Sequence, residues 1–306
     1  MPGKAPPVAT KLSTMRRVGV IGLGRIGMSV CARLVAARFE VVCTDLEPGR
    51  RVIAEATGAS WRRDVAAVAA GVEVAVTVLP GPAEVTAVID AVSGSLPAGG
   101  VWLDLSTASP AVARRIAAAA AARDVAVVDA PIGGGPADAR DGTLLSFAGA
   151  AEGDLDRVRD VLAAFTRAVV HVGPHGSGYT LKLIANALWF EQAVATAEVL
   201  AIAVRAGLDP DTVQRALAQS AAGRGFVADE ARALLAGDAM PSFALARCAA
   251  QLRTLDELAG ELAVPADVLA AVARVHSDAV ARYGDVDGEL LGARFAAERA
   301  GVQLGA

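Results

Sequence analysis

A short apolar strand, a glycine-rich turn and a helix in succession constrain the fold of this chain more than any other segment. Residues 17–21 form the predicted strand, and a helical run continues to residue 37. In such a turn one glycine permits the sharp bend, another lets the backbone approach a pyrophosphate, and the last lets helix pack on strand. The N–H groups and dipole of the helix start then face the phosphates. The turn predicts a dinucleotide site at Gly22, Leu23, Gly24, Arg25, Ile26 and Gly27.

An acidic residue after the next strand supports this interpretation. A second strand is predicted over residues 40–44, and Asp45 follows it, roughly 20 residues after Gly22. An acid at this place binds the adenosine ribose 2′-hydroxyl and repels a 2′-phosphate. Arg50 and Arg51 argue the other way, since arginines near this point can accommodate the phosphate, but we expect them at the start of the next helix. NAD is therefore the predicted cofactor, with NADP possible.

Strand-like and helical segments alternate in the first part of the chain, and helical segments alone follow. The predicted strands are 17–21, 40–44, 74–79, 101–105, 124–129, 143–149 and 168–172. This alternation indicates an α/β fold with a Rossmann-type, doubly wound, mostly parallel sheet. The predicted helices after residue 176 are 177–206, 210–219, 226–235, 243–262, 266–282 and 288–300. We expect a flexible leader (1–15), a dinucleotide-binding domain (16–174) and an all-helical C-terminal domain for substrate and oligomerisation (175–306).

A lysine in an apolar helix is the second informative feature. Lys182 and Asn186 are four residues apart, which places both on one helix face, and their neighbours are mostly Leu, Ile and Ala. A buried ammonium needs a partner, so Lys182 snorkels, forms an ion pair or serves a pocket. Phe190 lies one further turn along the same face. It continues the pocket or belongs to ordinary core packing.

Several motifs in order resemble the β-hydroxyacid dehydrogenase family, which includes the 3-hydroxyisobutyrate, tartronate semialdehyde and 6-phosphogluconate dehydrogenases. The resemblance extends from about residue 16 to residue 300. The motifs are the glycine turn at 22–27, Leu79-Pro80, Asp104-Leu-Ser-Thr107, Asp129-Ala-Pro-Ile-Gly-Gly-Gly135 and the Lys182/Asn186 helix. The resemblance implies that Leu79, Pro80 and Thr107 contact the cofactor. It also implies that Ser106, Gly133, Gly134 and Gly135 bind the substrate, and the spacing along the Lys182/Asn186 helix adds Phe190 as a further candidate substrate contact.

In this family the lysine is the general acid/base. Lys182 would take the hydroxyl proton during oxidation and return a proton to the carbonyl during reduction, with Asn186 orienting it. The implied reaction moves a hydride between a nicotinamide cofactor and a small 3-hydroxyacid or its semialdehyde.

Two departures from the family pattern affect the substrate assignment more than the reaction class. Gly133 stands where the family has a serine, so one hydroxyl donor to the substrate is missing. Backbone N–H groups of the glycine run can still hold a carboxylate. Ala250 and Gln251 stand where the family has a Lys-Asp pair, and Arg247 or Arg253 are candidates to supply the charge.

Two other functions therefore stay open. An imine or aldehyde reductase on the same fold would suit the departures at Gly133 and Ala250. Imine reductases, however, replace the family lysine, and Lys182 argues against them. A non-catalytic, dinucleotide-binding regulatory protein would have no need of both Lys182 and Asn186.

Composition narrows the partners and the compartment. The net charge of −4 and the pI of about 5.5 give no basic face for nucleic acid. No uninterrupted apolar run reaches the ~18 residues of a membrane-spanning helix. The three cysteines do not form a C-x-x-C pair, which favours a reduced, cytoplasmic protein, and the three histidines have no metal-ligand spacing. We expect no metal, no membrane and no nucleic acid, and a small, anionic substrate.

Assembly is predicted from the helical half. Segments 193–206 and 268–273 are apolar on more than one face, and such helices must be covered on every side. Members of the resembling family commonly pair through this domain. We therefore expect a homodimer or a homotetramer.

Overall fold

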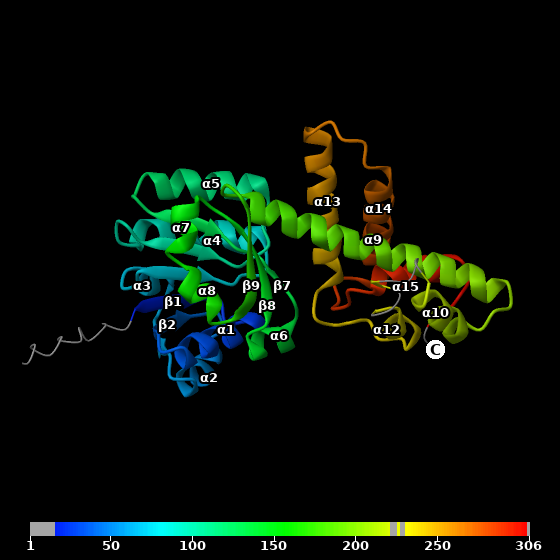
Figure 1. Cartoon of the computed structure of the whole chain (residues 1–306), viewed down its shortest axis with the longest axis horizontal. Helices are drawn as coiled ribbons and strands as arrows, with labels where there is room; N and C mark the ends of the chain where they lie inside the picture. The colour runs from blue at the N-terminus through cyan, green and yellow to red at the C-terminus, as the bar shows by residue number, and fades with distance from the viewer. Residues whose placement is uncertain (1–15, 221–224, 227–229, 305–306) are drawn as a thin grey trace, which may run out of the picture.

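The computed structural model describes residues 16–220, 225–226 and 230–304, so the predicted leader lies outside the described residues. Strands and helices alternate up to Gly173, and the described elements from Ser177 onward are helices (Figure 1). The strands are β1 (Arg17–Ile21), β2 (Glu40–Thr44), β3 (Ser60–Trp61), β4 (Val74–Thr77), β5 (Val101–Asp104), β6 (Ala126–Asp129), β7 (Ile132–Gly133), β8 (Leu144–Gly149) and β9 (Thr166–Gly173).

The strand order creates a ligand crevice beside β1. The order is β3-β2-β1-β4-β5-β6-β8-β7, with β9 also paired to β8. The first six strands are parallel, which confirms the predicted doubly wound sheet, whereas β8 runs antiparallel to β6 and β7. Because the chain leaves β1 toward β2 and later returns to its other side at β4, the carboxyl ends of β1 and β4 flank the switch point where open sheets bind ligands.

Helices cover both faces of the sheet, each with its own apolar core. One core joins the sheet to α1, α2, α6, α7 and α8, and the other joins it to α3, α4 and α5. The helices are α1 (Arg25–Ala36), α2 (Arg50–Ala56), α3 (Val65–Ala69), α4 (Pro82–Ser95), α5 (Pro110–Ala121), α6 (Pro136–Asp141), α7 (Glu152–Asp156) and α8 (Arg159–Ala163).

A single long helix, α9 (Ser177–Arg205), links the sheet to the helical half and carries the predicted lysine (Figure 1). Its first turn buries Tyr179 in the sheet core, and from Ala187 onward its side chains enter the helical cores. Among the described residues, α9 is the one helix with the length and mean hydropathy to cross a membrane, but 56% of that apolar window is buried. Burial in both halves explains most of this apolar composition, whereas Ile184 and Leu188 are exposed.

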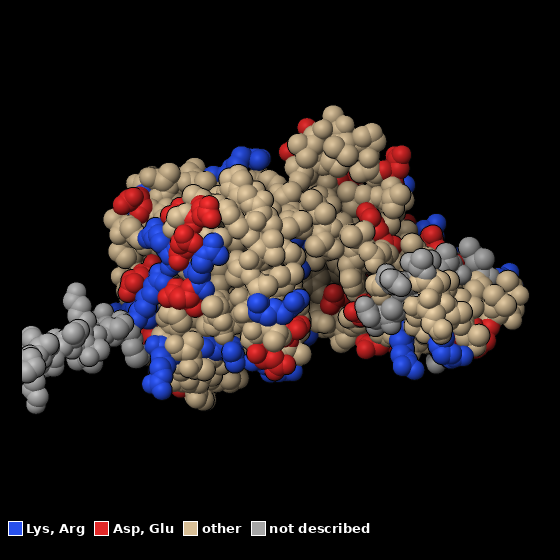
Figure 2. Space-filling model, in the orientation of Figure 1, with Lys and Arg blue, Asp and Glu red and all other residues tan. Residues whose placement is uncertain are grey.

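The helical half packs around α9. Its further helices are α10 (Pro210–Ala218), α12 (Ala231–Leu235), α13 (Leu245–Glu261), α14 (Asp267–Tyr283) and α15 (Leu291–Arg299). Helices α13, α14 and α15 share an apolar core with α9. Figure 2 shows a hollow between the two halves, with acidic side chains on its helical side.

Candidate active site

The glycine turn after β1 has the backbone geometry that only glycine permits. Gly22 has a φ of +90°, and a Cβ there would lie 2.4 Å from the Val78 carbonyl oxygen. A Cβ on Gly27 would lie 2.0 Å from the Gly22 carbonyl oxygen. Gly24 caps α1 without a side-chain hydrogen bond, so the first N–H groups of the helix face the crevice uncapped. This turn therefore fits a pyrophosphate on the helix start.

Arg25 reaches away from the turn into the helical half. Its guanidinium donates to the Pro241 carbonyl oxygen at 2.8 Å and pairs with Asp287 at 3.3 Å. Ile26 packs against the sheet core. The side chain of Arg25 thus joins the two halves beside the predicted cofactor site, a role that the motif alone did not predict.

Asp45 lies beside the glycine turn, as its position in the sequence predicts. Its Oδ2 accepts from the Leu23 N–H at 2.6 Å, and its Oδ1 accepts from the Glu47 N–H at 2.8 Å. Arg50 is 3.4 Å from Asp45 and 2.9 Å from Glu47, and is therefore already engaged by two acids. Arg51 pairs with Glu55 at 2.9 Å, along the exposed side of α2.

Ser106, in the turn after β5, binds the backbone of Leu79, which is a predicted cofactor contact. The Ser106 hydroxyl accepts from the Leu79 N–H at 2.9 Å and donates to Asp104 at 2.6 Å. Ser106 is buried and both of its hydrogen-bonding functions are used inside the protein. We therefore do not retain the predicted substrate contact for Ser106. Thr107 and Pro80 instead line a cavity between the two halves.

That cavity lies where the sheet half meets α9 and α13. Its volume is about 190 Å³. Its lining joins the two predicted cofactor loops to the helical half: Pro80, Gly81, Pro82, Ala83, Glu84, Thr107, Ala108, Leu183, Arg247, Ala250, Gln251 and Thr254. Of the two arginines considered as replacements for the family lysine, Arg247 reaches this cavity.

Two buried aspartates at the ends of β5 and β6 fix the start of α9. Asp104 accepts hydrogen bonds from Thr77, Ser106 and the Tyr179 hydroxyl. Burial raises the pKa of Asp104, and these donors oppose the rise. Asp129 accepts from the N–H of Tyr179 at 3.0 Å. Because both carboxylates bind the first turns of α9, the sheet positions the helix that carries Lys182.

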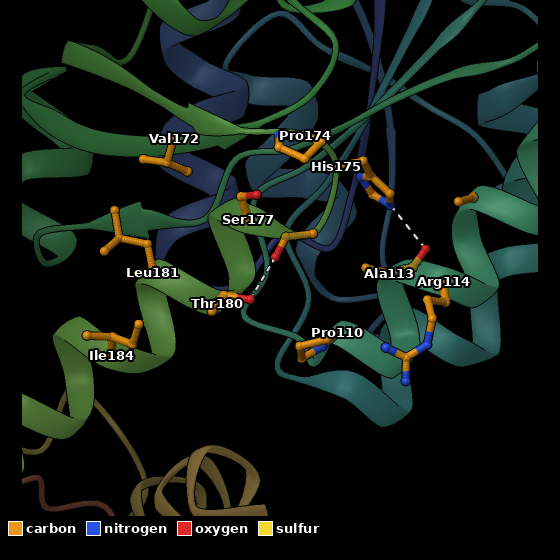
Figure 3. A pocket seen from close by; sticks show the side chains of 12 residues that line it. Pro110, Ala113, Arg114, Val172, Pro174, His175, Ser177, Thr180, Leu181 and Ile184 are labelled. Atoms are coloured by element: carbon orange, nitrogen blue, oxygen red, sulfur yellow. Dashed lines mark hydrogen bonds between the residues drawn. The ribbon is translucent and has the colours of Figure 1, made fainter. Parts of the chain in front are cut away.

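His175 completes this anchor. Its Nδ1 is 2.8 Å from Asp129, and its Nε2 is 3.1 Å from the Ala113 carbonyl oxygen on α5 (Figure 3). Burial works to lower the pKa of His175, but the Asp129 carboxylate raises it and the net shift is upward. An imidazolium would donate to both acceptors. His175 also borders an open hollow of about 770 Å³ at the α5/α9 junction, and Lys182 is not among the residues that line this hollow.

Lys182 and Asn186 lie one turn apart on α9, as predicted. Burial lowers the pKa of Lys182 to about 8, and the charge of Glu289 opposes this shift. Asn186 donates from Nδ2 to the Gln251 Oε1 at 2.7 Å. Gln251, which replaces the family aspartate, thus links Asn186 to the cavity wall.

One N–H group of the glycine run after β6 already donates a hydrogen bond within the protein. Gly134 has a φ of +111°, and the Gly135 N–H donates to Asp138 at 2.8 Å. The Gly135 N–H is therefore not available for a substrate carboxylate in this conformation. Gly133 ends β7 and has space around its Cα, with no atom closer than 3.8 Å to an added Cβ.

Phe190 belongs to the core of the helical half, contrary to the predicted substrate contact. Its ring is 2% exposed and makes edge contacts with Trp189 at 5.5 Å and a tilted contact with His276 at 5.4 Å. The helix turns its apolar stripe into the core one turn beyond Asn186, so ordinary packing explains this aromatic residue.

Comparison with known proteins identifies the family. The model for the NAD binding domain of 6-phosphogluconate dehydrogenase matches residues 17–173, which is more than half of the chain. A second model, described as NAD-binding of NADP-dependent 3-hydroxyisobutyrate dehydrogenase, matches residues 176–291. The chain belongs to the β-hydroxyacid dehydrogenase family. The predicted family, fold class and NAD(P) cofactor are thereby confirmed.

Curated relatives of this β-hydroxyacid dehydrogenase act on small hydroxyacids. A 3-hydroxyisobutyrate dehydrogenase of Pseudomonas aeruginosa is 32% identical over 68% of this chain and 71% of its own length. A 2-(hydroxymethyl)glutarate dehydrogenase of Eubacterium barkeri is 31% identical over 75% of this chain and 77% of its own. An NAD-dependent L-serine dehydrogenase of P. aeruginosa is 31% identical over 68% and 71%. The chain is thus a hydroxyacid dehydrogenase of the 3-hydroxyisobutyrate dehydrogenase type.

Solved structures support the same fold. A 3-hydroxyisobutyrate dehydrogenase of Salmonella typhimurium aligns over 91% of this chain and 99% of its own, with a TM-score of 0.81 and 26% identity. An imine reductase of Streptomyces aurantiacus aligns over 90% of this chain and 98% of its own, with a TM-score of 0.60 and 19% identity. At that identity the imine reductase shows a shared fold alone.

Sequence reasoning missed several residues of this β-hydroxyacid dehydrogenase site. Tyr179 and His175 act through Asp104 and Asp129, and the signal for them was the pair of acids that end neighbouring strands. Glu289 was not singled out, because nothing in the sequence relates this acid to the distant Lys182. Within the described ranges, no group of three His, Cys, Asp or Glu side chains is placed to hold a metal ion.

Proposed function

We propose that this dehydrogenase oxidises a small 3-hydroxyacid to its semialdehyde, or reduces the semialdehyde, with Lys182 as the general acid/base. The observation that carries the proposal is a half-buried lysine on α9, one turn from Asn186 and its cavity-lining partner Gln251, with a pKa that burial lowers to about 8. A base with a pKa near the working pH transfers protons efficiently.

The substrates named for its relatives share one chemical unit. 3-Hydroxyisobutyrate, 2-(hydroxymethyl)glutarate and L-serine each carry a hydroxymethyl group on the carbon that also bears a carboxylate. This unit is the proposed substrate class here, and the substrate is therefore anionic at its carboxylate. Gly133 and Gly134 are the proposed N–H donors to that carboxylate, since Gly135 is bound to Asp138.

The protein's part in the reaction is orientation and proton transfer. When bound, the nicotinamide supplies the hydride acceptor or donor. In oxidation, neutral Lys182 takes the hydroxyl proton as the C–H bond breaks, and in reduction the ammonium form protonates the carbonyl oxygen. Asn186 orients the lysine and the substrate oxygen. The turn at 22–27 would hold the pyrophosphate, and Leu79, together with the cavity-lining Pro80 and Thr107, would border the nicotinamide end.

NAD is the proposed cofactor in preference to NADP. The support is Asp45, which lies against the glycine turn, together with the ion pairs that engage Arg50 and Arg51 with acids. A 2′-phosphate would have to displace those acids from the arginines.

The proposed assembly is a homodimer or homotetramer in the cytoplasm, with the domain boundary near residue 174. The support is an apolar outer face on α9, where Ile184 is 46% exposed and Leu188 is 54% exposed. Light scattering coupled to size exclusion tests the assembly, and a mass of 30.9 kDa at micromolar concentration would refute it.

Nicotinamide absorbance with a panel of small hydroxyacids, semialdehydes and cyclic imines tests the function. Each compound is assayed with NAD and with NADP. Turnover of a hydroxymethyl acid is the expected result. Turnover of cyclic imines alone would assign the chain to the reductases, and binding of NAD without any turnover would favour a regulatory protein.

A further inference from the structure

The Asp104 carboxylate, at the end of β5, divides its two oxygens between different parts of the molecule. Oδ1 accepts from the Thr77 hydroxyl on β4 and from the Ser106 hydroxyl, both at 2.6 Å. Oδ2 accepts from the Tyr179 hydroxyl on α9. Among the described residues, Tyr179 is the one side chain that donates to Oδ2. This hydroxyl therefore makes the direct link between Asp104 and the helix.

The Oδ1 side of the carboxylate leads to the predicted cofactor loops. Ser106 binds Asp104 with its hydroxyl and, at 3.1 Å, with its N–H. The same hydroxyl accepts from the Leu79 N–H at 2.9 Å. The residues that follow directly, Pro80 and Thr107, line the cavity between the two halves. Asp104 thus holds the backbone of both loops at this cavity.

The Oδ2 side leads to the helix that carries the lysine. Tyr179 precedes Lys182 by three residues and Leu183 by four, so the three side chains are neighbours on one side of α9. Leu183 lines the same cavity as Pro80 and Thr107. One buried carboxylate therefore connects the loops on one wall of the cavity to the helix on another.

The start of α9 is packed closely on the ends of the strands. A Cβ on Gly178 would lie 2.4 Å from the Phe147 carbonyl oxygen, and a Cβ on Gly149 would lie 2.7 Å from the Gly178 backbone nitrogen. The Tyr179 N–H donates to Asp129 at 3.0 Å. The Tyr179 hydroxyl is a second attachment point, away from the helix axis. An attachment at the backbone together with one away from the axis restrains rotation of the helix.

The geometry points to Tyr179 as a positioning residue for proton transfer, whose hydrogen bond to Asp104 holds the rotation of α9 that directs Lys182 toward the substrate. This inference rests on the proposed role of Lys182 as the general acid/base. Tyr179 and Asp104 are both fully buried. Without the hydroxyl, Oδ2 would be a buried oxygen that lacks a donor, which favours a rotated or shifted helix start.

A displaced lysine should slow the chemical step and leave binding unchanged. A misplacement of about 1 Å can lower a rate roughly 10²-fold, because proton transfer requires hydrogen-bond geometry. NAD is expected to bind at the glycine turn beside Asp45, where the Leu23 N–H donates to Asp45. That contact lies outside the hydrogen bonds that Asp104 shares with Tyr179. Loss of the hydroxyl should therefore appear in kcat.

The test is Tyr179→Phe, which keeps the ring and removes the hydroxyl. The oxidation of 3-hydroxyisobutyrate with NAD gives kcat and KM, and fluorescence titration gives the Kd for NAD. The titration also counts the NAD sites, and kcat is expressed per site so that misfolded protein does not contribute. We expect kcat to fall about 10- to 100-fold, with KM and Kd near wild type.

Thr77→Val is the matched control for stability. It removes another hydroxyl that donates to Asp104, and it also leaves the Trp102 Nε1–H, which donates to Thr77 at 2.8 Å, without its acceptor. The free energy of unfolding should therefore fall at least as much as in Tyr179→Phe. Because Thr77 lies on β4 and its hydroxyl makes no hydrogen bond to α9, kcat per site should stay near wild type.

Gly178→Ala is a second variant that displaces the helix start while keeping the Tyr179 hydroxyl. Its Cβ would lie 2.4 Å from the Phe147 carbonyl oxygen, so the first turn of α9 must move. The same fall in kcat, with KM and Kd near wild type, is expected. This variant decides the question if Tyr179→Phe yields no NAD sites.

The outcomes separate this inference from the function on which it rests. Wild-type kcat in Tyr179→Phe, or an equal fall in Thr77→Val, would overturn the positioning role and leave the dehydrogenase function intact. A loss confined to KM or to the Kd for NAD would overturn it as well, because it would indicate a binding defect. No turnover of any hydroxyacid by the wild-type enzyme would overturn the proposed function itself.

Discussion

The dinucleotide turn and the proposed proton-transfer junction differ in how the chain assembles them. The turn is local: Gly22, Gly27 and Asp45 follow one another closely in the chain, and their backbone contacts require glycine. The junction draws Lys182 from α9, Gln251 from α13 and an acid from the segment before α15. A local site can be recognised from a motif, whereas a site made of distant segments depends on how the two halves pack.

Removal of the lysine should have the largest effect on turnover, and it tests the junction without altering the dinucleotide turn. Lys182→Ala should lower turnover by about 10²–10⁴-fold, because general acid/base catalysis contributes this much. NAD affinity, measured by fluorescence titration, should stay near wild type because the contacts of the dinucleotide turn with Asp45 and Asp287 do not involve Lys182. Lys182→Arg is the control that keeps the charge but cannot deprotonate. Wild-type turnover in either variant would remove Lys182 from the chemistry.

The converse change breaks the turn. Gly27→Ala places a Cβ 2.0 Å from the Gly22 carbonyl oxygen, so the backbone must move. We expect a loss of about 1–3 kcal/mol in the free energy of unfolding, as for other overpacked sites, together with weaker NAD binding. Gly49→Ala is the control, since an added Cβ there meets nothing within 4 Å. Denaturant unfolding measures both, and equal stability of the two variants would contradict the close approach seen at Gly27.

The preference between NAD and NADP tests the role of Asp45 beside the dinucleotide turn. Asp45→Ala should reduce a preference for NAD over NADP by about tenfold, because a hydrogen bond to a charged group is lost and Arg50 keeps only one of its two acidic partners, Glu47. Arg51→Ala should leave the preference unchanged, since Arg51 pairs with Glu55 on the exposed side of α2. The ratio of kcat/KM values for the two cofactors measures this. A wild-type enzyme that prefers NADP would show that Arg50 dominates over Asp45.

The dinucleotide turn was predictable from the sequence, whereas the junction around Lys182 was predictable only in part. The strands β1, β2, β4, β5 and β6 follow from apolar runs, but β3 and β7 are two residues long and give no periodic signal. The Lys182/Asn186 spacing predicted one helix face correctly. The same spacing predicted that Phe190 lines the pocket, but the structure buries this ring in the core of the helical half. The spacing shows that residues share a helix face, and it does not show where along the helix that face passes from the cleft into the core.

Contacts between distant segments account for what the sequence did not reveal. Ser106 is a buried link between Leu79 and Asp104, which only the pairing of β4 with β5 makes visible. Tyr179 reaches Asp104 because α9 docks on the sheet ends. Neither a motif nor a periodic pattern predicts a contact between residues so far apart in the sequence.

The pH dependence of the two reaction directions tests the environment of the junction. Burial lowers the pKa of Lys182 from 10.5 to about 8, so the neutral base becomes abundant as the pH rises through 8. Oxidation should therefore speed up about tenfold per pH unit below this value and level off above it. Reduction needs the ammonium form and should slow above the same pH. An oxidation rate that still rises toward pH ~10.4 would indicate a lysine with an ordinary solvent-exposed pKa.

The smallest expected effect concerns the partner of Asn186. Gln251 accepts a hydrogen bond from Asn186 at 2.7 Å, so Gln251→Ala leaves the Asn186 amide free to turn. A lost neutral hydrogen bond is typically about 0.5–1.5 kcal/mol, which predicts a turnover decrease of about 2- to 10-fold. Asn186→Ala should lower turnover at least as much, and the double variant no further than Asn186→Ala alone. Arg253→Ala, an exposed change on the same helix, is the control. Additive losses in the double variant would show that Gln251 acts separately from Asn186. In that case the hydrogen bond between α9 and α13 would not contribute to the orientation of Lys182.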